Sequence, residues 1–131
     1  MLKTHSRLIF LTYLLFLVLA AVLPINSGSS SLNNTFIIHI RLDYLLHAIL
    51  FIPWAFLYLL TFRPVKWNGK LMMVAAGLLM AFATEGVQYF LTYRSYNIND
   101  LLSNFLGVVL GSLMLFTNIQ RVMVTWLQNE K

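Results

Sequence analysis

The segment EGVQYFLTYRSYNINDLLSNFLGVVLG, residues 85–111, places carboxylates, amides and an arginine inside and between apolar runs. An acidic side chain in the middle of an apolar membrane helix costs about 2.5–3.5 kcal/mol on insertion scales, so it usually faces the protein interior and has a polar partner there. We therefore expect Glu85 to face other helices, and we take this segment as the functional centre of the chain.

The composition indicates a small integral membrane protein. Of its 131 residues, 60% are hydrophobic and 10% are charged, whereas soluble domains average about 25% charged residues. The length suits a single domain, residues 1–131. The absence of cysteine excludes disulfides, thiol nucleophiles and thiolate metal ligands. The formal charge of +5 is dispersed among apolar segments, so we predict no nucleic-acid partner.

The apolar runs predict an all-α fold, an integral membrane four-helix bundle with an amphipathic C-terminal extension. The first run could also be a signal peptide, but no A-x-A cleavage site follows it, so we favour a retained helix. The predicted spans cover residues 8–23, 42–62, 71–92 and 99–117, and the tail covers residues 118–131.

Two residues predict local features of these spans. Pro53 lies in the middle of the second span, where it removes the hydrogen bond to the Ile49 carbonyl and predicts a kink. Asn99 has a residue type favoured at helix starts, and we predict that it is the N-cap of the fourth span.

The distribution of basic residues predicts cytoplasmic N- and C-termini. With that orientation, seven of the nine Lys and Arg residues lie on the cytoplasmic side, and Arg41 and Arg94 lie outside. Three spans then place pairs of polar residues at the outer end of the bundle. These pairs are Asp43 and His47, Glu85 and Gln88, and Asp100 and Asn104. We expect a shallow polar pocket in the outer leaflet, rimmed by Tyr44, Tyr89, Tyr93 and Tyr96, with Glu85 about 10 Å below the outer helix end.

The order and spacing of these polar residues resemble the VanZ-like family of small bacterial membrane proteins. The resemblance rests on DYLLH at residues 43–47, EGVQ at residues 85–88, Arg94, and DLLSNFLGVVLG at residues 100–111, and it covers residues 42–115. It implies a location in the bacterial cytoplasmic (inner) membrane. It also implies a link to low-level resistance to teicoplanin, a glycopeptide that acts at the outer membrane face.

The candidate site residues have both functional and structural interpretations. The ligand-binding candidates are Asp43, His47, Glu85, Gln88, Arg94, Asp100 and Asn104, and the catalytic candidates are Glu85, His47, Asp43 and Asp100. Alternatively, Glu85 is a buried acid that ties spans together, and Asp43 and Asp100 stabilise the first turns of their helices. Gly107 and Gly111 are four residues apart, a spacing typical of close helix packing.

Two of these candidates have expected partners. We expect Arg94 to clamp Asp43 or Asp100, or else to hold an anionic ligand. We expect His47 to donate a hydrogen bond to Asp43 or Glu85.

The sequence is compatible with two main classes of function, and a transporter, whose four spans would form a pore only as an oligomer, is a third possibility. The first is a non-enzymatic protein that binds an amphiphile, such as a lipid headgroup, a lipid-linked cell-wall precursor or part of a glycopeptide. The second is an enzyme that acts on a lipid-linked substrate through carboxylate and histidine acid-base chemistry or through a metal. The sequence contains no recognised catalytic motif, and we predict no cofactor and assign no metal ligand. The other expected partners are membrane lipids, and a homo-oligomer is compatible with the sequence.

Overall fold

The computed structural model describes residues 2–23, 35–37, 40–63, 66–93, 96–116 and 125. The all-α prediction is confirmed, because helices make up most of this part of the chain. The helices are α1 (Leu2–Val22), α3 (Leu42–Phe51), α4 (Pro53–Phe62), α5 (Trp67–Tyr89) and α6 (Ile98–Phe116). The predicted tail, residues 118–131, lies outside the described residues except for Thr125.

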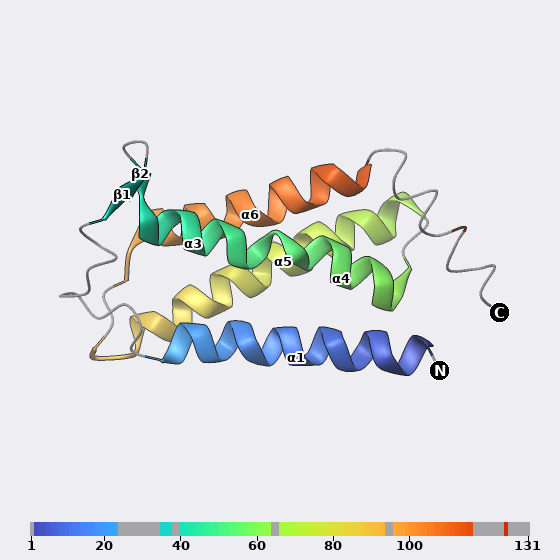
Figure 1. The fold of residues 1–131 in the computed structure, drawn as a ribbon, viewed down its shortest axis with the longest axis horizontal. Coiled ribbons are helices and arrows are strands. Elements are labelled where there is room, and N and C mark those ends of the chain that lie inside the picture. Colours follow the sequence, from blue (N-terminus) through green and yellow to red (C-terminus); the bar gives the residue numbers. More distant parts are fainter. Residues whose placement is uncertain are drawn as a thin grey trace.

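The helices form a bundle in which α3, α4 and α6 run in one direction and α1 and α5 run in the other (Figure 1). Helix α6 packs against α3, α4 and α5, while α1 packs against α4 and α5. The first turn of α3, the last turn of α5 and the first turn of α6 lie at the same end of the bundle (Figure 1). Polar residues that are far apart in the sequence are therefore brought to one place.

The second predicted span is divided into α3 and α4 at the position that Pro53 predicts. Ile52 separates the two helices and keeps helical angles, with φ of −56° and ψ of −44°. Because proline has no N–H, it cannot donate to the Ile49 carbonyl. Helix α1 contacts this region through Tyr13, whose hydroxyl donates to the Leu50 carbonyl at 2.8 Å.

The outer surface of the bundle is apolar. Large hydrophobic side chains are widely exposed, for example Leu79 at 69% and Phe90 at 82%. Within the described residues, three helices are long and apolar enough to cross a membrane, namely residues 5–22, 42–62 and 67–89, and α6 contains a shorter apolar stretch, Ile98–Leu113. Such a surface suits contact with hydrocarbon, whereas soluble proteins rarely expose apolar patches of this extent. The chain is therefore a membrane protein.

Helices α3 and α6 approach each other closely at two glycines. A Cβ atom added at Gly107 would collide with the carbonyl oxygen of Ala48, and one added at Gly111 would collide with that of Ile52. Backbone atoms cannot move aside as a flexible side chain can. The small residues of α6 therefore set its distance from α3.

Three helices differ in their bounds from the predicted spans. Helix α1 covers Leu2–Val22 and not residues 8–23. Helix α5 covers Trp67–Tyr89 and not residues 71–92, so it begins before the apolar run and ends earlier. Helix α6 begins at Ile98, and the side-chain oxygen of Asn97 accepts a hydrogen bond from the Asn99 N–H at 3.1 Å. The prediction that Asn99 is the N-cap was therefore wrong, because Asn97 makes the capping bond and Asn99 lies within the helix.

A short hairpin precedes α3 and was not predicted. Strands β1 (Phe36–Ile37) and β2 (Ile40–Arg41) pair antiparallel, with Phe36 opposite Arg41. The N–H of Leu42, the first residue of α3, donates to the Thr35 carbonyl at 2.9 Å. This bond satisfies one of the N–H groups that a helix start leaves without a partner inside the helix. The hairpin thus places Arg41 directly before α3.

Candidate functional site

The candidate site is built around the imidazole of His47 on α3. Its Nδ1 lies 3.1 Å from the amide oxygen of Asn104 on α6. The Asn104 amide nitrogen in turn donates to Glu85 Oε1 on α5 at 2.8 Å. Glu85 Oε1 also lies 3.6 Å from His47 Nδ1. One polar network therefore joins three helices.

The other ring nitrogen of His47 faces two more carboxylates. Nε2 lies 3.9 Å from Asp43 Oδ1 and 3.9 Å from Asp100 Oδ2. Both separations exceed the usual hydrogen-bond range of about 2.7–3.2 Å. Asp43 reaches this position because it lies one helical turn before His47, and Asp100 because α6 packs against α3.

Each of these aspartates has a neighbouring donor. Arg41 from β2 forms an ion pair with Asp43 Oδ2 at 2.9 Å, and its guanidinium also donates to the Tyr44 hydroxyl at 3.0 Å. Asn97 donates to Asp100 Oδ1 at 3.1 Å. The other oxygen of each aspartate, Asp43 Oδ1 and Asp100 Oδ2, faces His47.

Three of the four acidic residues of the chain take part in this cluster, which we define as Arg41, Asp43, His47, Glu85, Asp100 and Asn104. Glu85 and Asn104 are each 1% exposed, and Asp43 is 3% exposed. The His47 side chain is more open, at 14%. The imidazole thus lies among the three carboxylates at the centre of the cluster.

The structure does not bring every predicted site residue into this network. Gln88 is buried on α5 at 4% exposure, one turn beyond Glu85. Arg94 lies outside the described residues. Sequence reasoning missed Arg41 and Asn97 as site residues. The available signal was a basic residue two positions before Asp43 and an amide three positions before Asp100.

The site differs in two respects from the predicted one. The shortest contact of His47 in the cluster is with the Asn104 amide and not with a carboxylate. In addition, α5 ends at Tyr89, so Glu85 lies about 6 Å from the helix end and not about 10 Å. The three central side chains therefore lie between about one and two turns from the ends of their helices.

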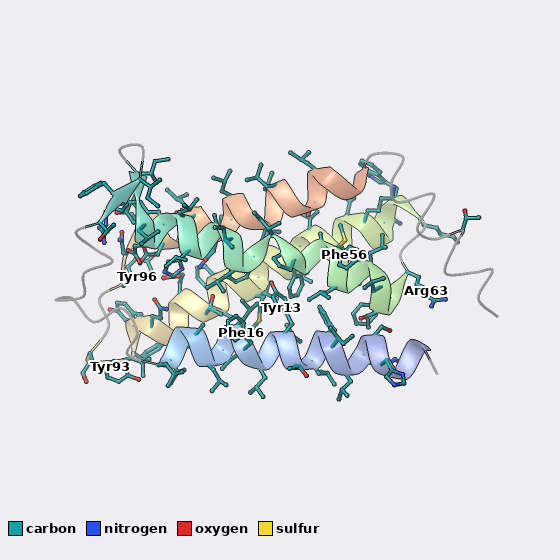
Figure 2. All side chains as sticks on the ribbon, viewed as in Figure 1. Tyr13, Phe16, Phe56, Arg63, Tyr93 and Tyr96 are labelled. Atoms are coloured by element: carbon teal, nitrogen blue, oxygen red, sulfur yellow. The ribbon has the colours of Figure 1, made fainter. Side chains whose placement is uncertain are left out.

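Tyrosines surround this end of the bundle. Tyr93 and Tyr96 lie there, while Arg63 lies at the opposite end (Figure 2). Tyr89 is 68% exposed, and its ring lies 6.1 Å from that of Tyr96. Tyr44 is partly buried and accepts hydrogen bonds from Arg41 and from Asn99, the latter at 3.3 Å. The Tyr93 hydroxyl donates to the Val22 carbonyl at 2.6 Å, which ties α1 to this end.

Comparison with known proteins extends the similarity beyond the motif residues. The family model described as VanZ/LLP1 matches residues 8–120, so it includes residues 8–22 of α1, which the sequence motifs did not cover. No match was found among curated proteins or among solved structures. The family match covers most of the chain and contains every described residue of the cluster. The chain therefore belongs to the VanZ-like family.

Proposed function

We propose that this VanZ-like membrane protein binds the polar head of an amphiphile at the outer face of the bacterial cytoplasmic membrane. The ligand classes are a lipid headgroup, a lipid-linked cell-wall precursor or part of a glycopeptide antibiotic, and binding contributes to glycopeptide tolerance. The observation that carries the proposal is the gathering of three of the four acidic residues around His47 at one end of an apolar bundle.

The chemistry of this end suits an amphiphilic ligand. Arg41 supplies a cation, the aspartates and Glu85 supply acceptors, and Asn104 supplies an amide next to the imidazole. Exposed tyrosine rings stand beside the cluster, and tyrosine is favoured at the boundary between hydrocarbon and water. A molecule with a polar head and an apolar tail meets both kinds of surface here.

Binding at the outer face requires the cluster end to face outward, and cysteine labelling tests this orientation. Thr92→Cys and Asn68→Cys place single thiols at exposed positions at opposite ends of α5 in a chain without native cysteine. In intact cells we expect an impermeant maleimide to label the cysteine at position 92 and to leave the one at position 68 unlabelled until the membrane is opened. Labelling only at position 68 would reverse the orientation.

The binding proposal is tested with matched histidine variants. We expect the wild-type protein and His5→Gln to retain the same co-purified amphiphile in native mass spectrometry. His5 is exposed in the first turns of α1, and α1 starts at the opposite end of the bundle. His47→Gln should weaken binding about tenfold or more, equivalent to roughly 1.4 kcal/mol. Equal binding by all three proteins would contradict the proposal.

The same variants are then compared for glycopeptide susceptibility in a susceptible host. We expect the wild type and His5→Gln to lower susceptibility to teicoplanin, and His47→Gln to behave like the empty vector. Membrane abundance is measured in parallel, so that loss of the protein is not taken for loss of its site.

An enzyme acting on a lipid-linked substrate is the second candidate function. The observation that favours it is that both ring nitrogens of His47 face carboxylates, with Glu85 on one side and Asp43 and Asp100 on the other. An imidazole oriented by carboxylates is suited to proton transfer. Glu85→Gln distinguishes the two functions, because loss of tolerance with unchanged amphiphile binding supports catalysis, and parallel loss of both supports binding.

A further inference from the structure

We infer that Asp43, His47 and Asp100 form a binding site for a divalent metal ion. Each residue offers one ligand atom, and these atoms all lie within 4.8 Å of one another. The inference goes beyond the proposed function, because binding of an ion can be measured in the absence of any amphiphile.

The hydrogen-bond network determines which nitrogen of His47 is available to the ion. The Asn104 amide nitrogen donates to Glu85, so the Asn104 oxygen faces His47. An amide oxygen can only accept a hydrogen bond, so Nδ1 carries the hydrogen. In the neutral imidazole, Nε2 then holds the lone pair that a metal requires.

The two aspartates lie on the side of this lone pair. Nε2 is 3.9 Å from an oxygen of each, which is long for a hydrogen bond. Two ligand atoms that each lie about 2.1 Å from a shared ion are separated by roughly 3.0–4.2 Å for angles between 90° and 180°. The two separations from Nε2 fall within that range.

The surroundings of the three ligands match those of known metal sites. A histidine ligand usually donates its other N–H to a polar group that fixes the ring, and Asn104 supplies such a group, supported by Glu85. The second oxygens of Asp43 and Asp100 accept hydrogen bonds from Arg41 and Asn97, which orient the carboxylates. Glu85, Asn104, Arg41 and Asn97 are thus positioning residues.

The charge of the cluster also favours a cation. Three buried carboxylates face the imidazole, and Arg41 pairs with one of them. A divalent ion between Asp43 and Asp100 would offset the remaining negative charge. One imidazole and two carboxylates suit Zn²⁺ and Mn²⁺, since imidazole favours zinc and carboxylate favours manganese. Three protein ligands also leave coordination positions open for an anionic group such as a phosphate.

The test is ion binding by the purified full chain in detergent, prepared with a tag that contains no histidine and treated with a chelator. Zn²⁺ and Mn²⁺ are each added back, and the bound metal is measured by equilibrium dialysis with elemental analysis. We expect one ion per chain for the wild type and for His5→Gln. Asp100→Asn and His47→Gln should bind at least about tenfold more weakly.

Two results would overturn the inference, namely a wild type that binds neither ion and a wild type that binds no more tightly than Asp100→Asn. The number of ions bound per wild-type chain tests the inference even if a variant does not accumulate. Co²⁺ offers a second readout, because bands in the visible spectrum of the Co²⁺ form that are lost in His47→Gln report direct coordination. Amphiphile binding is measured with and without chelator, so that a failure of ion binding can be distinguished from a failure of the proposed function.

Discussion

His47→Leu is expected to destabilise the folded protein by roughly 1–3 kcal/mol, because the buried amide oxygen of Asn104 loses its hydrogen-bond partner. Leucine fills much of the same space but has no ring nitrogen. Asp43, Glu85 and Asp100 would then face an apolar group at distances where an imidazole now lies.

The measurement for this variant is unfolding of the purified protein in mixed micelles, followed by circular dichroism as SDS increases. His5→Leu is the matched control, because His5 is exposed in the first turns of α1. We expect its transition to coincide with that of the wild type. If His47→Leu and His5→Leu unfolded at the same SDS fraction, the imidazole would not hold the cluster together.

Gly107→Ala and Gly86→Ala are expected to change stability in opposite directions. The added methyl group at position 107 collides with the backbone carbonyl of Ala48, and overpacking of this kind costs about 1–3 kcal/mol. At position 86 the added Cβ meets nothing within 4 Å. There the higher helix propensity of alanine should stabilise α5 by up to about 1 kcal/mol.

The same SDS titration measures both glycine variants. Both variants make the same chemical change within a helix. The difference between their changes in stability therefore measures the effect of the close approach of α3 and α6. Destabilisation of equal size at both positions would mean that Gly107 has no special packing role.

The all-α fold and the end of the bundle where polar residues meet could be predicted from the sequence. Hydrocarbon penalises a lone carboxylate, so Glu85 on α5 had to face other helices, and its partner Asn104 lies on α6. The positions of Asp43 and His47, one turn apart, predicted a shared helix face. These predictions rest on the free-energy penalty for a carboxylate in hydrocarbon and on the periodicity of the α-helix.

The detailed partners could not be predicted in this way. Arg41 reaches Asp43 from a hairpin of two-residue strands, which is too short to leave a periodic pattern in the sequence. Asn97, and not Asn99, caps α6, because neighbouring asparagines compete for the same role and the backbone turn decides between them. Asn104 is the nearest partner of His47 because of where α6 packs, which no local signal reports.

The central claim is that His47 and Asn104 interact inside one cluster formed by three helices, and a double-mutant cycle tests it most directly. His47→Ala, Asn104→Ala and the double variant are unfolded in SDS, and the coupling free energy is calculated. We expect a coupling of about 0.5–2 kcal/mol, as found for contacting polar pairs in membrane proteins. The matched cycle of His47→Ala with His5→Ala should be additive within about 0.3–0.5 kcal/mol. An equally additive cycle for His47 and Asn104 would contradict the account.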